Sequence, residues 1–358
     1  MNKHIQYMQR AYTLALKGQG TTLPNPMVGA VLVKSGKVIA EGWHLRCGAD
    51  HAEAMAISKA GIKAKGCELY VTLEPCSHTG RTPPCTEAII KAGIKKVYVG
   101  VLDPNARMNG KSVALLRKAG IAVEVGFLQD ELTQMNEAFN KYITTGMPWV
   151  VGKTAQTLDG KVATLKGESK WITSDATREF SRQLRSRYNG IVVGINTVLA
   201  DDPCLIVHDK TKRLIKIIID SKLRISLKAR LFNGTTPADV IVITTTKAPA
   251  AKQQALRKQA QVLVAPLKGG QVDLHWAFKA LAKQEIAAIL LEGGPTLIGS
   301  ALKVGLVDKM HIYIAPQIMG EGLPSIRGLK VKSLAQTVKL KDVSLGTIGN
   351  DVFIEGYI

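Results

Sequence analysis

Short apolar segments rich in β-branched residues alternate with segments of helical spacing along most of this chain. Such alternation is typical of α/β proteins, in which helices cover a sheet. In the first part we expect a hairpin that turns at Ser35–Gly36 and joins 29–33 to 37–40, followed by strands at 69–73, 97–101 and 122–125. We expect helices at 51–60, 85–92 and 111–119, the last two ending at Gly93 and Gly120.

The pattern begins again after the sequence Thr-Thr-Gly-Met-Pro at 144–148. A single core rarely grows beyond about 250–300 residues, so 358 residues predict two domains, 1–146 and 147–358. The second domain is also expected to be α/β. Its predicted strands are 149–153, 190–194, 214–220, 240–244, 261–265, 287–291 and 309–315, its predicted helices are 175–188, 273–283 and 296–304, and a terminal hairpin is expected over 338–358 with a turn near Gly349–Asn350.

Charge and composition narrow the choice of partner. The formal net charge is +20, with +7 on 1–146 and +13 on 147–358, so the excess is spread along the chain. An anionic partner is expected, and aromatic residues at 5% are few for a surface that stacks bases. Phosphorylated small molecules are therefore favoured over a polynucleotide. No segment has the roughly 18 apolar residues of a membrane span and no export signal is recognisable, so we expect a soluble, cytoplasmic protein.

The strongest chemical signal is a set of possible metal ligands. Five cysteines in a chain without an export signal do not predict a disulfide framework. One imidazole, His51, and two thiolates, Cys76 and Cys85, could hold a tetrahedral zinc and leave its fourth position to water. Such a zinc lowers the pKa of water towards about 7, and Glu53, close to a ligand without being one, could move a proton from water to a leaving amine.

The alternative is that His51 lies on the surface and both cysteines are core thiols. The Glu-Pro-Cys sequence at 74–76, directly after an apolar strand, favours the zinc deaminase interpretation. We expect all three ligands at helix starts, where the thiolate form is stabilised. The other cysteines, Cys47, Cys67 and Cys204, have no spacing partner and are expected to be buried and unliganded.

Eight residues separate Cys76 from Cys85, where nucleobase deaminases commonly have two. The sequence Glu-Pro-Cys-Ser-His-Thr-Gly-Arg-Thr-Pro-Pro-Cys at 74–85, with Pro-Asn-Pro-Met-Val-Gly at 24–29, closely resembles the bifunctional riboflavin-biosynthesis deaminase/reductases. The resemblance implies a cytidine-deaminase-like, three-layer first domain that deaminates 2,5-diamino-6-(5-phosphoribosylamino)pyrimidin-4-one with zinc. It also implies that the pyrimidine and its phosphate contact Asn25, His44, His78 and Arg81.

The second domain lacks the Gly-x-Gly-x-x-Gly of a Rossmann fold, but 289–296 form a strand, two glycines and a helix start that could hold a phosphate. Residues 153–160, 167–173, 194–203 and 292–294 are similar to the reductase domain of the same family, which resembles dihydrofolate reductase. The resemblance implies that this domain reduces the ribosyl group to ribityl with NADPH. It implies NADPH contacts at Ala155, Trp171, Thr197, Asp201, Ser221, Gly294, Pro295, Thr296, Leu297, Ile298, Gly299 and Ser300, and substrate contacts at Ser169, Arg185, Leu205, His208 and Glu292.

Two of these residues, His208 and Asp201, need separate comment. The family commonly has arginine where this chain has His208, and a histidine near pH 7 is often neutral, which weakens its expected contact with phosphate. Asp201 is expected to assist opening of the ribose ring. Arg178 and Arg182 share a predicted helix face with Arg185 and are expected to be solvated.

The sequence thus predicts a bifunctional enzyme with zinc and NADPH, a phosphorylated pyrimidine substrate and a homo-oligomeric state. Its main rival is a deaminase that edits tRNA or single-stranded nucleic acid, suggested by the +20 charge and the shared zinc chemistry. A degenerate, non-catalytic scaffold is disfavoured because Glu53 and all three candidate ligands are present.

Overall fold

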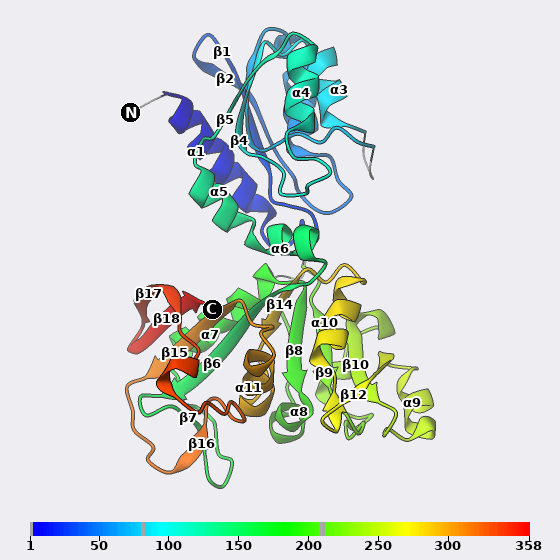
Figure 1. Cartoon of the computed structure of the whole chain (residues 1–358), viewed down its shortest axis with the longest axis vertical. Helices are drawn as coiled ribbons and strands as arrows, with labels where there is room; N and C mark the ends of the chain where they lie inside the picture. Colours follow the sequence, from blue (N-terminus) through cyan, green and yellow to red (C-terminus); the bar gives the residue numbers. More distant parts are fainter. Residues whose placement is uncertain (1–2, 80–82, 208, 210–211) are drawn as a thin grey trace. The chain divides into compact units, whose positions relative to one another are not determined.

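The computed structural model describes residues 3–79, 83–207, 209 and 212–358 (Figure 1). The chain divides into two compact units, 1–147 and 148–358, next to the boundary expected at 146. Each unit has its own sheet. Among the described residues, no helix is both long and apolar enough to cross a bilayer.

The first unit contains a five-stranded sheet in the order β2-β1-β3-β4-β5. The hairpin and the other three predicted strands are confirmed, with bounds of β1 Gly29–Lys34, β2 Lys37–Trp43, β3 Glu68–Leu73, β4 Lys96–Val101 and β5 Ala122–Val125. Strand β1 pairs antiparallel with β2 and β3, and β3, β4 and β5 run parallel. The predicted helices are confirmed as α2 Ala52–Ala60, α3 Cys85–Lys91 and α4 Lys111–Lys118.

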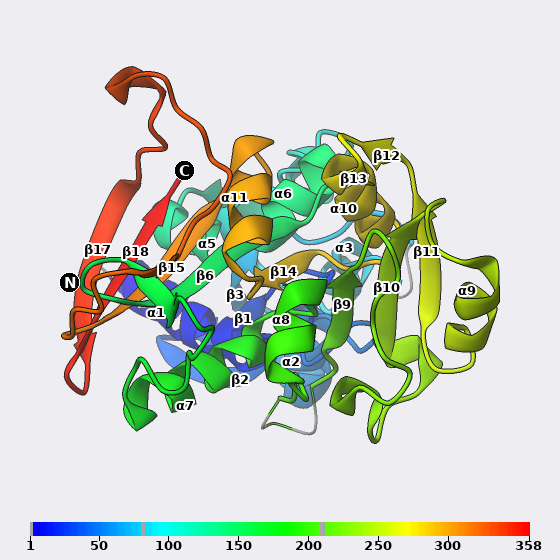
Figure 2. The same cartoon turned by 90° about the horizontal axis from the view of Figure 1, so that it is seen from below.

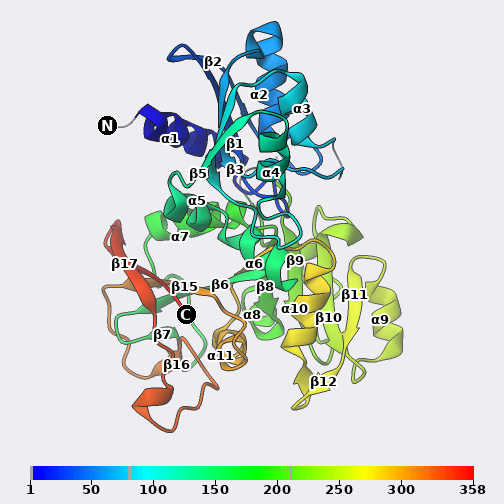
Figure 3. The same cartoon turned by 45° about the horizontal axis from the view of Figure 1, so that its top comes forward.

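Alternating side chains of these strands enter two separate hydrophobic clusters. Leu32 and Val71 pack with α2, α3 and α4 on one face, whereas Val31 and Tyr70 pack on the other face with α1 (Lys3–Ala15) and α5 (Gln129–Met135). Figure 3 shows α2, α3 and α4 together, with α1 across the sheet from them. Because successive residues of a strand point to opposite faces, this alternation produces the expected three layers.

Three helices of the first unit were not predicted: α1, α5 and α6 (Glu137–Thr145). They are largely polar; α6 contributes no fully buried residue, and only Leu132 of α5 is buried. Helix α1 buries Met8, Ala11 and Ala15, whose helical spacing is a signal that could have identified it.

The second unit contains a nine-stranded sheet in the order β11-β10-β9-β8-β14-β6-β15-β18-β17. Its strands are β6 Trp149–Thr157, β8 Gly190–Gly194, β9 Ile215–Ile219, β10 Val240–Thr245, β11 Gln261–Ala265, β14 Ala288–Leu291, β15 Lys309–Ala315, β17 Lys341–Ile348 and β18 Asp351–Tyr357. The run from β11 to β15 is parallel, and the terminal hairpin adds β18 and β17 antiparallel (Figure 2). All predicted strands of this unit are confirmed.

The predicted helices of this unit are present as α7 Asp175–Leu184, α10 Leu274–Ala282 and α11 Pro295–Lys303. The helix expected to reach residue 188 ends earlier, and a 3₁₀ turn follows at Arg185–Arg187. The unpredicted elements are short: α8 Ile195–Asp201, α9 Ala250–Leu256, β7 Lys161–Thr164, β12 Leu267–Lys268, β13 Gln271–Val272 and β16 Gly322–Pro324. Helices α8 and α11 begin where β8 and β14 end, so their first residues meet at one edge of the parallel sheet.

Candidate functional site

The three predicted metal ligands come from two helix starts and one loop. His51 is the N-cap residue of α2, and Cys85 is the first residue of α3. The prediction that Cys76 also begins a helix is wrong, because it lies in the loop after β3. Its sulfur nevertheless accepts the backbone N–H of Cys85 at 3.3 Å, so the start of α3 stabilises negative charge on it.

The ligand atoms are close enough to share one metal ion. His51 Nδ1 lies 3.5 Å from Cys76 Sγ and 3.3 Å from Cys85 Sγ, and all three atoms are within 4.8 Å of one another. A tetrahedral zinc with ordinary Zn–N and Zn–S bonds gives N–S separations of about 3.6 Å. The donor set and its geometry therefore fit zinc, with Nδ1 as the ligating atom of the imidazole.

Hydrogen bonds make the two thiols unequal. Those from Cys85 and His51 hold the pKa of Cys76 at about 4, well below its ordinary value. The negative Cys76 sulfur, burial and the carboxylate of Glu53 raise the pKa of Cys85. Cys76 is therefore the thiolate of the pair, a form already suited to binding metal.

Glu53 lies beside the metal ligands on the first turn of α2, without belonging to the ligand group. Its side chain is buried, and burial raises the pKa of its carboxyl group. Gly42 on β2 allows this placement, because a Cβ there would lie 2.1 Å from the carbonyl oxygen of Ala52. A buried carboxyl group of raised pKa can hold and release a proton.

Two predicted substrate residues meet next to His51. Asn25 Nδ2 donates to His44 Nε2 at 3.1 Å, and His44 Nδ1 donates to the carbonyl oxygen of Asp50 at 3.0 Å. The His44 and His51 rings lie edge to face with centroids 5.4 Å apart. Burial lowers the pKa of His44, so its ring is neutral. His78 lies exposed two residues beyond Cys76, and Arg81 is outside the described residues.

Glu74, which the motif contained but to which no role was assigned, organises the loop beside the metal site. Its buried carboxylate accepts the backbone N–H groups of Asp103, Gly110 and Ser112 and the Ser112 hydroxyl, at 2.6 to 3.1 Å. It thereby ties the segment between β4 and α4 to the strand end that precedes Cys76. The convergence of donors from a distant segment could not be read from the local sequence.

The cysteines outside the metal site differ from expectation. Cys67 is buried as predicted, but Cys47 and Cys204 are only partly buried, so the prediction of burial is wrong for these two. Both lie in loops, where less side-chain packing covers them.

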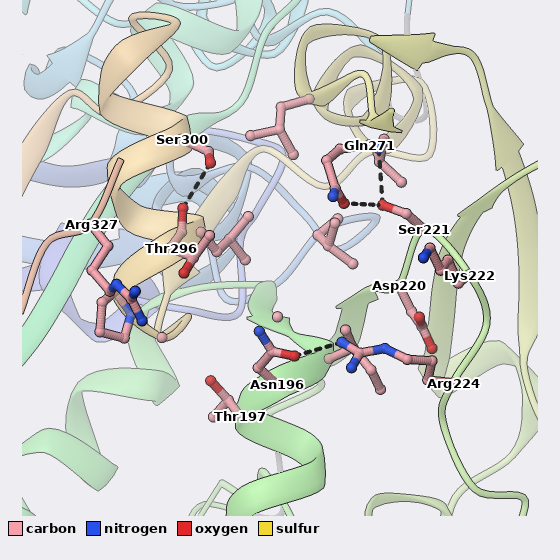
Figure 4. Close-up of a pocket in the computed structure, with 18 of the residues that line it drawn as sticks. Asn196, Thr197, Asp220, Ser221, Lys222, Arg224, Gln271, Thr296, Ser300 and Arg327 are labelled. Carbon is pink, nitrogen blue, oxygen red and sulfur yellow. Dashed lines mark hydrogen bonds between the residues drawn. The ribbon is translucent and has the colours of Figure 1, made fainter. Parts of the chain in front are cut away.

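A pocket of about 500 Å³ in the second unit gathers part of the predicted NADPH site (Figure 4). Of the predicted residues, Thr197, Ser221, Gly294, Pro295, Thr296, Leu297 and Ser300 line it. The N-cap residue of α11, Gly294, offers no side-chain cap, and a Cβ there would lie 3.0 Å from Thr197 Oγ1. The glycine thus leaves space for a ligand to approach free backbone N–H groups, which fits a dinucleotide phosphate.

Sequence reasoning missed the cations of this pocket. Lys222, Arg224 and Arg327 line it, and Arg224 Nη2 donates to Asn196 Oδ1 at 2.5 Å. Figure 4 shows Lys222 and Arg224 on the side of Ser221, with Arg327 near the α11 start. Lys222 and Arg224, one and three residues after Ser221, were a readable signal for binding an anionic cofactor.

The remaining predicted NADPH residues do not line this pocket. Ile298 packs in the core, and Gly299 lies against the backbone of Arg327. Ala155 is partly buried on β6, and Asp201 is the last residue of α8. Trp171 is 67% exposed, with the Arg178 guanidinium 4.4 Å from its ring centroid. The expectation that Arg178 is solvated is wrong, because the ring and the Thr173 carbonyl oxygen engage its guanidinium.

Two predicted substrate residues form a largely buried ion pair. The guanidinium of Arg185 donates two hydrogen bonds of 2.9 Å to the carboxylate of Glu292, and a third to the carbonyl oxygen of Ile206 at 3.2 Å. Despite burial, Arg185 lowers the pKa of Glu292, so Glu292 is charged. The charge of Arg185 is therefore already balanced, which weakens the expectation that it binds the substrate phosphate.

Lys153 lies within electrostatic reach of this pair. Burial lowers the pKa of its ammonium group, while Glu292 opposes that shift. Lys153 is the first residue of the motif at 153–160, and the motif alone does not indicate a role for its side chain. Leu205 is buried near Ile206, Ser169 is partly buried, and His208 lies outside the described residues.

Comparison with known proteins identifies both units. The family model described as RibD C-terminal domain matches residues 148–354, and that of the cytidine and deoxycytidylate deaminase zinc-binding region matches 1–101. The RibD proteins of Aquifex aeolicus and Escherichia coli are 48% and 40% identical, each over 97% of this chain, and the alignments cover 96% and 97% of those proteins.

Two solved structures share the whole fold. Acinetobacter baumannii RibD has a TM-score of 0.89 at 37% identity, and the deaminase/reductase of Thermotoga maritima has 0.88 at 36%; each match covers 99% of this chain and 98% of the other. The expected cytidine-deaminase-like and dihydrofolate-reductase-like folds are confirmed, as are zinc and NADPH as cofactors. The chain belongs to the RibD family of bifunctional deaminase/reductases of riboflavin biosynthesis.

Proposed function

We propose that the first unit hydrolytically deaminates 2,5-diamino-6-(5-phosphoribosylamino)pyrimidin-4-one and that the second reduces the ribosyl group of the product to ribityl with NADPH. The final product is then 5-amino-6-(5-phosphoribitylamino)uracil. The observation that carries this proposal is the group of His51, Cys76 and Cys85 beside a buried carboxyl group that is not a ligand. The Thermotoga maritima relative is described as the deaminase and reductase of these phosphoribosylamino compounds.

In the deaminase unit, zinc when bound supplies a Lewis acid that activates water for attack on the amino-bearing carbon. Glu53 accepts a proton from the attacking water and returns it to the departing amine, which leaves as ammonia. Asn25 and His44, already joined by a hydrogen bond next to His51, orient the pyrimidine. Burial of Glu53 keeps bulk water from exchanging that proton.

In the reductase unit, NADPH when bound supplies the hydride. The α11 start and the cations of the Figure 4 pocket hold its anionic part. The side chains of Arg185 and Glu292, with the ammonium group of Lys153 nearby, are the polar groups that contact the ribosyl chain. Asp201, Ser169, Leu205, Ala155 and Trp171 remain proposed contacts from the resemblance, with Asp201 assisting ring opening.

One assay tests both activities. The phosphoribosylaminopyrimidine is supplied with and without NADPH, while ammonia and the absorbance of NADPH are followed together. We expect ammonia in both cases and NADPH oxidation only after ammonia has formed. Release of no ammonia by zinc-loaded enzyme would contradict the deaminase assignment, and release without later NADPH oxidation would contradict the reductase assignment.

We further propose a cytoplasmic setting and a homo-oligomer. The cysteines in the described part of the chain are free thiols, which is typical of a reducing compartment.

Strand β17 forms an edge of the nine-stranded sheet and leaves Leu345 72% exposed, which favours pairing with a second copy of the chain. Light scattering should give a mass above one chain, reduced by Leu345→Lys; a monomeric wild type would contradict this.

A further inference from the structure

Three polar side chains form a row across neighbouring strands of the nine-stranded sheet (Figure 2). His311 on β15 is paired in register with Lys153 on β6 and, on its other side, with Glu355 on β18. Directly opposed residues of neighbouring strands point to the same face of a sheet, so these side chains lie side by side. We call them the β15 row. The proposed reduction uses neither His311 nor Glu355.

One end of the β15 row is a carboxylate–imidazole pair. The His311 side chain is buried, and its Nε2 lies 3.3 Å from Glu355 Oε2, while Glu355 Oε1 lies 3.4 Å from Lys309 Nζ. The hydrogen bond with His311, together with the charge of Lys309, lowers the pKa of Glu355 to about 2. Glu355 is therefore a carboxylate and accepts the proton of Nε2, which leaves the lone pair of a neutral imidazole on Nδ1.

The other end places a buried acceptor beside an ammonium group. His311 Nδ1 is buried and has no hydrogen-bond partner in the described part of the chain. Within the same residues, Lys153 forms no hydrogen bond or ion pair, and its Nζ lies 5.6 Å from the ring centroid of Tyr313. A second proton on Nδ1 would bury a donor that faces this ammonium group, which is unfavourable. The two groups are complementary, and rotation of the flexible lysine stem can join them.

The β15 row continues into the ribosyl site. Strand β14 pairs with β6 on the side away from β15, and Glu292 follows directly after Leu291, which is opposite Gly152. Lys153 therefore has Glu292 on one neighbouring strand and His311 on the other. Burial and the carboxylates of Glu292 and Glu355 raise the pKa of Tyr313, so this ring lies within electrostatic reach of both carboxylates.

We propose that Glu355 and His311 are positioning residues of the reductase. Glu355 holds the His311 proton on Nε2, and the Nδ1 lone pair accepts a hydrogen bond from Lys153, which directs the ammonium group at the ribosyl chain. Both residues act through Lys153 and not by contact with the substrate. The inference rests on the proposed reductase function and adds to it the two residues that orient Lys153.

The first test is Glu355→Gln, which keeps the shape of the side chain. Lys309 retains the oxygen of the new amide, so the amide NH₂ group donates to His311 Nε2 and forces the imidazole proton onto Nδ1. Nδ1 then no longer accepts from Lys153. With full-length, zinc-loaded enzyme and the deaminated substrate, kcat for NADPH oxidation should fall at least about tenfold, while the KM for NADPH stays unchanged.

Variants of His311 and Lys153 test how the effect is transmitted. His311→Leu removes the acceptor and should lower kcat to a similar extent, whereas His311→Asn, whose carboxamide oxygen can take the place of Nδ1, should retain substantially more activity. In a Lys153→Ala background, Glu355→Gln should cause no further loss. His275→Asn, which changes an exposed histidine of α10 in the same unit, is the matched control and should keep the wild-type kcat.

Thermal unfolding and ammonia release from the diaminopyrimidine substrate verify that each variant is folded. A wild-type kcat in Glu355→Gln would overturn the inference. Equal losses in His311→Asn and His311→Leu, or a further loss in the Lys153→Ala background, would also overturn it, because the two residues would then act on the fold and not through Lys153. A wild type that does not oxidise NADPH with the deaminated substrate would instead contradict the proposed reductase function.

Discussion

Glu53 is the residue on which the hydrolytic step depends most directly. Its side chain is buried beside the three metal ligands, but it is not itself a ligand. Glu53→Gln keeps the shape and removes the proton transfer, so we expect zinc to stay at about one ion per chain while kcat for ammonia release falls at least about 100-fold. Metal analysis and an ammonia assay measure the two quantities.

The control for this variant is Glu131→Gln, which changes an exposed carboxylate on α5 of the same unit. The Glu131→Gln variant should retain about one zinc ion per chain and the wild-type rate of ammonia release. If Glu53→Gln still released ammonia at near the wild-type rate, Glu53 could not be the proton carrier.

The second prediction for single residues concerns the Arg185–Glu292 ion pair. Arg185→Ala leaves a buried carboxylate with only Lys153 nearby, and we expect unfolding of the reductase unit to become easier by about 3 kcal/mol. Arg185 lowers the pKa of Glu292, so the pair stabilises the fold above the ordinary pKa of Glu. That stabilisation is lost as pH falls through the lowered pKa.

Urea unfolding at pH 7 and below pH 4 measures this effect, and the difference between wild type and variant should shrink at acidic pH. The double variant Arg185→Ala with Glu292→Gln should recover part of the lost stability, because the carboxylate that has lost its guanidinium partner is then replaced by a neutral amide. A variant as stable as wild type at pH 7 would show that the pair is not stabilising.

Single residues of the site differ in how far the sequence determines them. The ligand types and their spacing predict His51, Cys76 and Cys85, because few other arrangements place an imidazole and two thiols near a strand end. The ligating nitrogen of His51 and the anchoring role of Glu74 depend on contacts between segments far apart in sequence. The partial exposure of Cys47 and Cys204 likewise depends on loop packing.

At the scale of elements, the strand-to-helix turns of the second unit determine the cofactor pocket. Ser221, Lys222 and Arg224 follow β9, and the 2′-phosphate is the group that distinguishes NADPH from NADH. We expect Arg224→Ala, combined with Lys222→Ala, to weaken NADPH binding at least about tenfold and NADH binding much less. Titration calorimetry with each cofactor measures both dissociation constants.

Arg230→Ala, which changes an exposed arginine of the same unit outside the pocket, serves as the matched control. It should alter neither dissociation constant. If the double variant weakened NADPH binding and NADH binding equally, Lys222 and Arg224 would contact a part of the cofactor that NADPH and NADH have in common, and not the 2′-phosphate.

Elements with strong apolar patterns were predictable, and polar or short ones were not. Strands β8, β9, β10 and β14 are almost wholly buried, and their β-branched sequences identify them. Helices α5 and α6 bury one residue or none, so no periodic apolar face marks them. The two-residue strands β12 and β13 exist only through pairing with each other.

At the scale of the whole molecule, the two large sheets and the two sets of motifs divide the chain at the same place. The break at 144–148 was visible because strand and helix signals start again after a Gly-Met-Pro turn. The residues that line the Figure 4 pocket all lie between 194 and 327, within the second unit. The metal ligands all lie within the first.

This division predicts that residues 148–358, expressed alone, bind NADPH and oxidise it with the deaminated substrate while releasing no ammonia. The unit has its own nine-stranded sheet, so it should fold without the deaminase unit. Circular dichroism, NADPH titration and absorbance measure folding, binding and turnover, with full-length Glu53→Gln enzyme, given the deaminated substrate, as the positive control. A folded fragment that binds NADPH as tightly as that control but does not turn over would show that the reductase reaction requires residues of the first unit.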